Sequence, residues 1–370
     1  MNSAPALASA SLERLDSLLL RLDEARHVRV AALSITRWLT PEPVPFARRE
    51  SGERAEIAVG EAWAPCLFDC AWMRFRATLP AGLEIAPGAL HARVDINGEL
   101  CVVDAHGVPA RGLTNIKSTF DPALGGPGKT LHRLPPEAIR DGAVEFWADA
   151  GLNDLFGFVK DEGRVALAEL VLIREDVRQL HYDLETLRDW LLADGETEGA
   201  APGRLREELA ALAEELDLED PAGIERARAR LAPWFSAADA KPALLVHAVG
   251  HAHLDLAWLW PVRETIRKGA RTFASALYNL ERYPEYVFGC SQPRLFAWMK
   301  EFYPALYSKI KDAVRAGRIE PQGTFWIEPD CSMPSGESFV RQIVHGARFF
   351  REEFGVVPRY CWQPDVFGYH

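Results

Sequence analysis

Three polar side chains at alternate positions, His251, His253 and Asp255, follow the apolar run 244–250. Residues two apart on an extended backbone point to the same face. If the apolar run is a buried strand, the three side chains can converge on one small volume at its carboxyl end. Imidazole nitrogens and carboxylate oxygens are ligands that zinc accepts readily. The spacing therefore favours a metal site, and solvated polar residues at the end of a strand are the alternative interpretation.

A further candidate ligand, Asp365, follows Asp255 by 110 positions. It ends a short, partly apolar stretch and lies between Pro364 and Gly368, where we expect irregular backbone. In a parallel sheet the carboxyl ends of the strands lie on one side, which is where binding sites form. We therefore expect Asp365 to join His253 and Asp255. A turn or helix-capping aspartate, common after proline, is the alternative.

Four segments carry further motifs in a fixed order: GHAHLDLAWLWP (250–261), CSQP (290–293), EPDCSMPSGES (328–338) and WQPDVFGY (362–369). Together they resemble the zinc-dependent α-mannosidases of glycoside hydrolase family 38, and among these the large cytosolic, vacuolar and bacterial branch. The resemblance is strong over residues 241–370. It is weaker before them, where GEAW (60–63) and WMRF (72–75) also fit that branch.

The resemblance implies a role for each matching position. His253 and Asp255 match the family's first two zinc ligands, and Asp365 matches the aspartate that is both zinc ligand and catalytic nucleophile. Trp258 matches an aromatic residue that lies under the substrate sugar. The implied cofactor is Zn²⁺ or another divalent metal such as Co²⁺. The family's remaining zinc histidine and its acid/base aspartate would lie beyond His370, so the resemblance implies an N-terminal fragment that is inactive alone.

The chemistry of such a site agrees with these residue types. A retaining glycosidase needs a carboxylate nucleophile and a second carboxyl group about 5 Å away, which acts first as acid and then as base. A metal can bind neighbouring hydroxyls of mannose and favour distortion of the ring. Trp258 would offer the sugar a flat apolar face, with a place in the core as the alternative. The expected reaction is hydrolysis of terminal α-D-mannosyl residues of mannose-containing oligosaccharides.

Three more polar residues, His251, Glu328 and Asp330, are candidates for supporting the metal ligands. Glu328 and Asp330 follow an expected strand and should lie on the same rim as the ligands. They can hold the loops around the sugar or hydrogen-bond to the ligands. The alternative for these acids is capping of the next helix, for which Ser335 and Ser338 are also suited.

The composition limits the partners of the chain. It has 42 Lys and Arg against 53 Asp and Glu, a net charge of −11. This balance argues against nucleic acid and anionic membranes, because both require concentrated basic residues. No apolar run approaches the ~20 residues that span a bilayer, and the N-terminus lacks a signal-peptide pattern. We expect a cytoplasmic protein whose full-length form can be a homo-oligomer.

Hydrophobic periodicity divides the first two thirds of the chain into three regions. Residues 1–47 are expected to form an N-terminal helix and a lead-in. Residues 48–173 alternate with period two and predict an antiparallel β-sandwich of jelly-roll type, in which Asn97-Gly98 signals a hairpin. Residues 174–240 carry leucines at helical spacing and predict a helical linker.

The last region, 241–370, alternates strands with helices and predicts a parallel sheet. The strands are expected at residues 244–250, 286–290, 318–327 and 359–363. The family's catalytic domain is a seven-stranded parallel β/α barrel-like fold, so the resemblance implies that its first half is present. The chain is therefore predicted to be a multidomain α+β protein.

Two other functions remain compatible with the sequence. A metal-dependent amidohydrolase or deacetylase also uses two histidines spaced like His251 and His253, but it needs histidines on later strands. A non-catalytic carbohydrate-binding module would use the sandwich tryptophans, Trp63, Trp72 and Trp147, as a sugar platform. Core positions for these tryptophans are the alternative.

Overall fold

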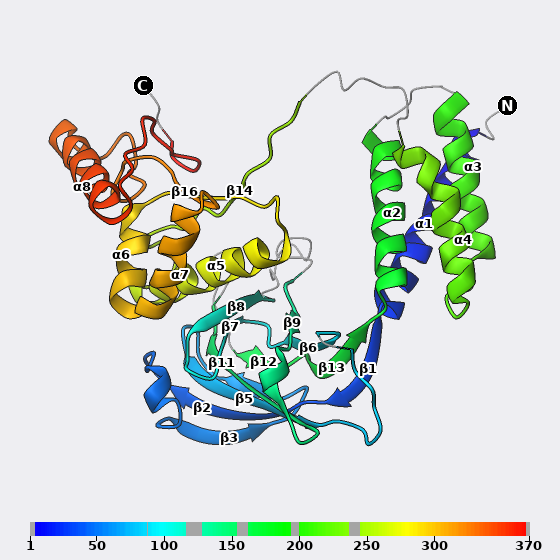
Figure 1. Ribbon diagram of the computed structural model, residues 1–370, viewed down its shortest axis with the longest axis horizontal. Coiled ribbons are helices and arrows are strands. Elements are labelled where there is room, and N and C mark those ends of the chain that lie inside the picture. Colours follow the sequence, from blue (N-terminus) through cyan, green and yellow to red (C-terminus); the bar gives the residue numbers. More distant parts are fainter. Residues whose placement is uncertain are drawn as a thin grey trace. The chain divides into compact units, whose positions relative to one another are not determined.

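The computed structural model describes residues 4–86, 88–115, 128–153, 162–193, 200–236 and 245–367 (Figure 1). The chain divides into two compact units. One consists of Met1–Val30, Glu84–His91 and Leu170–Val246, and the other of Ala31–Leu83, Ala92–Glu169 and His247–His370. Within the described residues, none of the helices has the length and apolar character needed to cross a membrane.

The first unit consists mainly of four helices. These are α1 (Ala4–Ala25), α2 (Glu175–Ala193), α3 (Ala200–Glu215) and α4 (Pro221–Phe235). Their apolar faces form one core, as the leucine spacing predicted. Its buried members include Leu15, Leu18, Leu22, Leu180, Leu184, Leu187, Leu191, Leu205, Leu209, Leu212, Leu216, Ile224 and Leu231. The helix expected in region 1–47 and those expected as a linker thus share a single core.

The β-sandwich lies mostly in the second unit and contains two sheets. The smaller sheet has the strand order β1 (His27–Ala32), β13 (Leu167–Ile173), β6 (Leu90–Asp95) and β9 (Leu131–Arg133). The larger sheet has the order β3 (Glu53–Ile57), β2 (Ser34–Thr40), β5 (Cys70–Thr78), β11 (Ala143–Gly151), β7 (Glu99–Val103) and β8 (Pro109–Thr114), with β10 (Ile139–Arg140) paired to β11. Two short strands, β4 (Ala62–Ala64) and β12 (Gly163–Arg164), pair separately. Strands β1 and β2 precede residue 48, so part of the lead-in belongs to the sandwich.

Both faces of the larger sheet are covered by packed side chains. Its strands pair antiparallel, as predicted. On one face the rings of Phe75 and Phe146 stack with centroids 4.8 Å apart. On the other face Trp38, Trp72 and Trp147 form a buried cluster. The central strands β2, β5 and β11 therefore contribute apolar side chains to both faces.

The hairpin predicted at Asn97-Gly98 is wrong, because β6 and β7 belong to different sheets. Asn97 adopts positive φ (48°), as the sequence signal requires. The chain then crosses between the layers instead of folding back. The side chain of Asn115 holds the crossing, since its Oδ1 accepts hydrogen bonds from the amides of Ile96 (3.0 Å) and Gly98 (3.2 Å). A turn signal fixes the backbone locally but does not choose the partner strand.

The last part of the chain forms a three-stranded parallel sheet with helices, as the alternation predicted. The strands are β14 (Gly250–His251), β15 (Phe288–Cys290) and β16 (Ile319–Pro321), in that order. The helices are α5 (Val262–Arg282), α6 (Pro293–Phe302), α7 (Pro304–Arg315) and α8 (Gly336–Phe354). Figure 1 shows α5 beside β7 and β8 of the sandwich.

The strand predicted at residues 359–363 is wrong, because this segment forms bends and irregular backbone. Pro358 and Pro364 bracket it, and neither has an amide hydrogen for a strand ladder. The strand predicted at 244–250 is also shorter than expected: of its described residues only Gly250 lies in β14, which ends at His251. The seven-stranded barrel therefore stays a prediction.

Close packing of α8 fixes the segment that follows β16. Gly346 lies on this helix where a β-carbon would come within 1.8 Å of the Thr324 carbonyl oxygen, so only glycine fits. In addition, the Gln342 side chain accepts a hydrogen bond from the amide of Ile327 (2.9 Å). The backbone just before Glu328 is thus held against α8.

Candidate metal and catalytic site

His253, Asp255 and Asp365 form a cluster of three possible metal ligands. One ligand atom from each lies within 4.8 Å of the other two. His253 Nε2 is 3.4 Å from Asp255 Oδ1 and 3.5 Å from Asp365 Oδ2. The loop after β14 supplies the first two residues, and the irregular segment before the C-terminus supplies the third. The structure therefore brings together the three residues that the sequence analysis assigned to a metal.

Glu328 contacts two members of this cluster, His253 and Asp365. Its Oε2 lies 2.9 Å from His253 Nδ1, and its Oε1 accepts a hydrogen bond from the Asp365 amide (2.8 Å). Because the Glu328 carboxylate lies beside Nδ1, Nε2 is the ring nitrogen that faces the two aspartates. One buried side chain, only 4% exposed, thus orients two of the three candidate ligands.

Three carboxylates, those of Asp255, Glu328 and Asp365, surround the single imidazole of His253. A hydrogen bond to Glu328 is the main cause that raises the pKa of His253 above its ordinary value; burial opposes the shift, and Asp255 adds to it. Asp365 is 55% exposed, so the cluster is open to solvent on one side. Such a group of acids around an accessible imidazole is suited to bind a cation, because a cation neutralises the carboxylates.

His251 does not lie in the cluster, although it was expected to converge with His253 and Asp255. Its Nδ1 lies 3.0 Å from the Gly289 carbonyl oxygen, and its Nε2 accepts a hydrogen bond from the Trp362 indole (3.2 Å). His251 therefore joins β14 to the segment that carries Asp365. The period-two argument assumed a strand that reaches Asp255, whereas β14 ends at His251.

Asp330 and Trp258 lie near the cluster in different roles. Asp330 Oδ1 accepts hydrogen bonds from the amides of Ser332 (2.7 Å) and Met333 (2.9 Å), so this acid caps its own turn, and Ser335 caps the next helix. Trp258 is 47% exposed and packs edge-on against Trp260, with centroids 5.5 Å apart. An exposed indole is available for a ligand, whereas a core residue is not.

Comparison with known proteins agrees with this geometry. Residues 243–370 match the N-terminal domain of glycosyl hydrolases family 38, and residues 30–177 match the jelly-roll domain of α-mannosidase. The chain belongs to glycosyl hydrolase family 38. The resemblance found in the four motifs is thereby confirmed.

Named relatives of this family 38 chain are α-mannosidases. Alpha-mannosidase 2C1 of Homo sapiens is 34% identical over 92% of this chain and 32% of the relative. The alpha-mannosidase of Saccharomyces cerevisiae is 28% identical over 86% of the chain and 30% of the relative. Alpha-mannosidase G of Dictyostelium discoideum is 43% identical over 37% and 12%. The chain spans about a third of the length of the human and yeast relatives.

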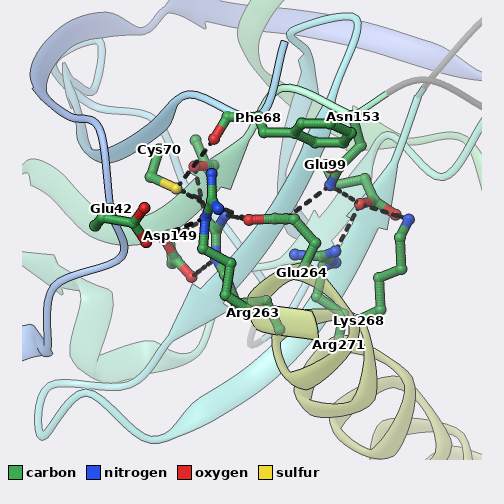
Figure 2. A network of polar contacts seen from close by, with 12 residues as sticks. Glu42, Phe68, Cys70, Glu99, Asp149, Asn153, Arg263, Glu264, Lys268 and Arg271 are labelled. Atoms are coloured by element: carbon green, nitrogen blue, oxygen red, sulfur yellow. Dashed lines mark hydrogen bonds and ion pairs between the residues drawn. The ribbon is translucent and has the colours of Figure 1, made fainter. Parts of the chain in front are cut away.

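A buried network of charges joins the first turns of α5 to the sandwich of this family 38 chain (Figure 2). Arg267 donates two hydrogen bonds to the Asp149 carboxylate on β11, at 2.6 and 2.9 Å. It also donates to Glu264 (2.7 Å) and to the Ala150 carbonyl oxygen (2.7 Å). The Arg267 side chain is only 2% exposed.

A second centre of the network is Glu99 on β7. It accepts hydrogen bonds from Lys268 (2.9 Å), Arg271 (2.6 Å) and Asn153. Burial raises the pKa of Glu99, but Arg271 and Lys268 outweigh burial and lower the pKa from 4.5 to about 2. Three acids, Glu99, Asp149 and Glu264, thus face three bases, and the network carries no excess charge.

Thr265 connects the start of α5 to the backbone of Asp255, one of the candidate metal ligands. This fully buried residue lies in the first turn of α5, next to Glu264. Its hydroxyl accepts a hydrogen bond from the Trp260 indole (2.9 Å) and donates to the backbone oxygen of Asp255 (3.4 Å). Sequence reasoning did not single out Thr265, Trp362 or the α5 charges, because nothing in their spacing marks them.

Proposed function

We propose that this chain supplies the nucleophile and three metal ligands of a metal-dependent retaining α-mannosidase. The observation that carries the proposal is the convergence of His253, Asp255 and Asp365 from segments more than 100 residues apart. The family and the names of the relatives support mannose-containing oligosaccharides as substrate. The likeness to family 38 also supports completion of the parallel sheet into a β/α barrel in the whole enzyme.

The three side chains fit a zinc ion. Zn–N and Zn–O bonds of about 2.0–2.1 Å in a tetrahedron separate neighbouring ligand atoms by about 3.4 Å. The separations from His253 Nε2 to the two aspartate oxygens are 3.4 and 3.5 Å. The mixed imidazole and carboxylate set suits Zn²⁺ and also Co²⁺. When bound, the metal would hold neighbouring sugar hydroxyls and favour the charge distribution of the transition state.

Asp365 is the residue we propose as nucleophile. The Glu328 carboxylate fixes its backbone amide, and its own carboxylate is exposed toward solvent. Attack on the anomeric carbon would form a covalent mannosyl ester and release the aglycone, and water would then hydrolyse the ester with net retention. We assign no acid/base residue within the described range 245–367.

Trp258 is the residue we propose beneath the sugar. Its exposed indole lies on the loop that carries His253 and Asp255, five and three positions after them. An aromatic ring at that place offers the C–H groups of a pyranose a flat apolar surface. Trp260 supports it edge-on, and the Trp260 indole is itself held by Thr265.

A cytoplasmic location is also part of the proposal. All six cysteines are free, including the buried Cys70, Cys101 and Cys290. Burial raises the pKa of Cys70 and Cys101 to about 12, so these thiols stay protonated. Structures without disulfides are usual in reducing compartments.

The non-catalytic sugar-binding module finds less support than the enzyme. Trp63, Trp72 and Trp147, the candidates for a sugar platform, are all buried, with exposures of 0%, 6% and 9%. The amidohydrolase alternative needs further histidines near His253. In the described residues the ligand cluster contains one histidine and two acids.

Metal analysis tests the proposed site directly. The purified chain is expected to bind about one zinc ion, and His253→Ala combined with Asp255→Ala to abolish binding. Asp330→Asn is the matched control, because this acid, two residues after Glu328, hydrogen-bonds to the backbone of its own turn and is not part of the ligand cluster found in the described residues. Zinc binding that survives the double change would refute the assignment.

Covalent labelling tests the nucleophile separately. A 2-fluoro-mannosyl fluoride is expected to modify the Asp365 carboxylate in the whole enzyme, and mass spectrometry of the peptide that contains Asp365 reads the adduct. A deacetylase would form no glycosyl ester. Labelling at another acid would overturn the role of Asp365 and leave the metal site standing.

A further inference from the structure

Gln292 lies between two of the loops that build the metal cluster. It lies two residues after the end of β15 and precedes Pro293, the first residue of α6. The side chain is buried, with 3% exposure of the residue. It belongs to none of the groups discussed above, neither the candidate ligands nor the α5 network.

Both ends of the Gln292 amide make short hydrogen bonds. Nε2 donates to the backbone oxygen of Leu254 at 2.7 Å, and Oε1 accepts from the backbone amide of Glu328 at 2.9 Å. Leu254 is the residue between His253 and Asp255. One side chain thus binds the backbone between two candidate ligands and the backbone of the acid that orients the third.

The backbone of Gln292 is in the left-handed region, with φ 65° and ψ 82°. Glycine adopts this conformation without steric cost, whereas other residues lose about 1 kcal/mol or more. A glycine here would relieve the backbone but would have no side chain to join the loops. A long amide at a position suited to glycine points to a role for the side chain itself.

We propose that Gln292 is a positioning residue of the metal site, which sets the distance between the His253–Asp255 segment and Glu328. This inference rests on the proposed metal-dependent function. The reason is chemical: a carboxamide offers a donor and an acceptor from the same rigid plane. Glutamate keeps the acceptor and loses the donor, and methionine loses both. Groups that orient metal ligands in this way typically change metal affinity about 10–100-fold when removed.

The experiment compares Gln292→Met, Gln292→Glu and Gln322→Met in the full 370-residue chain. Gln322 is the matched control, because it is a buried glutamine (6% exposed) after the neighbouring strand, packed against Gly289. Hydrogen exchange of the metal-free protein reads the amide of Glu328, and competition with a chromophoric chelator reads zinc affinity. None of the substitutions removes the backbone hydrogen bond from the Arg294 amide to the Trp326 oxygen (3.1 Å), so we expect α6 to stay attached to the segment before Glu328.

We expect Gln292→Met to accelerate exchange at Glu328 and to weaken zinc binding 10–100-fold. Gln292→Glu should keep the protection at Glu328, since its acceptor remains, and still weaken zinc binding. Gln322→Met should leave both measurements as in the unmodified chain. Unchanged exchange at Glu328 in Gln292→Met would overturn the positioning role. A chain that binds no zinc would refute the proposed metal site, and the exchange measurement would still decide the role of Gln292.

Discussion

Replacement of Arg267 by methionine is the strongest test of how the sandwich and α5 hold together. The change leaves Asp149 and Glu264 without their nearest cation, and the Glu264 side chain is fully buried. Removal of one partner of a buried ion pair costs about 3–5 kcal/mol, because the remaining charge has lost its water and its counter-charge. Glu264 keeps a hydrogen bond from Asn153 (3.0 Å). We therefore expect about 4 kcal/mol, roughly a thousandfold change in the unfolding equilibrium.

A second substitution makes this expectation sharper. Asp149→Asn added to Arg267→Met removes one of the two stranded carboxylates and should recover about 1–2 kcal/mol. Arg315→Met is the control, because Arg315 and its partner Asp312 are 70% and 66% exposed. An exposed pair of this kind contributes less than about 1 kcal/mol.

Hydrogen exchange measures these effects in the right part of the molecule. Peptides from β5, β7 and β11 report the opening free energy of the sandwich separately from that of the helical unit. If Arg267→Met costs less than about 1 kcal/mol, the buried charges are not mutually dependent. If Asp149→Asn adds to the loss instead of relieving it, charge balance is not what stabilises the interface.

Three further predictions concern other parts of the chain. The pKa of Glu99 is lowered from 4.5 to about 2, so its contribution to stability is complete above pH 4.5 and is lost as the pH falls toward 2. The free energy of unfolding should therefore decrease by up to about 3 kcal/mol across this window, and Glu99→Gln should reduce that decrease. An equal decrease in Glu99→Gln would contradict the shifted pKa. Gly346→Ala should reduce the free energy of unfolding by about 3 kcal/mol, because the new methyl group meets the Thr324 carbonyl oxygen. Gly336→Ala on the same helix meets no atom within 4 Å and should be neutral or slightly stabilising in thermal unfolding. Equal effects of the two substitutions would contradict this explanation. Trp258→Ala should leave the melting temperature nearly unchanged, since Trp258 is 47% exposed. The same substitution should weaken mannose binding by about 1 kcal/mol in a titration. Unaltered binding would show that Trp258 does not contact the sugar.

Much of the fold could be predicted because the signals are local. The leucine spacing identified helices α2 and α3, and the alternation around Phe75 identified β5, whereas α4 was not recognised as a separate helix. Hydrophobic periodicity reports which face of an element is buried, and the structure buries those faces. The alternation of strands and helices from β14 to α8 followed in the same way, but the strand predicted after α8 did not form.

Pairing between distant elements could not be predicted as well. Asn97-Gly98 has the sequence of a tight turn, yet the side chain of Asn115 and the packing of two sheets direct the chain across the sandwich. The charges of α5 look like an exposed polar face in the sequence, since Glu264, Lys268 and Arg271 follow one another at helical spacing. Only the presence of Glu99 and Asp149 on the facing strands turns them into a buried network.

The two histidines of the first motif show where sequence spacing stops being informative. His251 and His253 are both metal-competent and two residues apart, so an extended strand would present them on one face. The strand ends at His251, and the two histidines have different partners: the Gly289 carbonyl and the Trp362 indole for His251, and three acids for His253. The decisive quantity is therefore the position at which the ladder ends. β15 continues to Cys290, one residue past the partner of His251, so the end of the ladder is a property of the packed sheet and not of the motif.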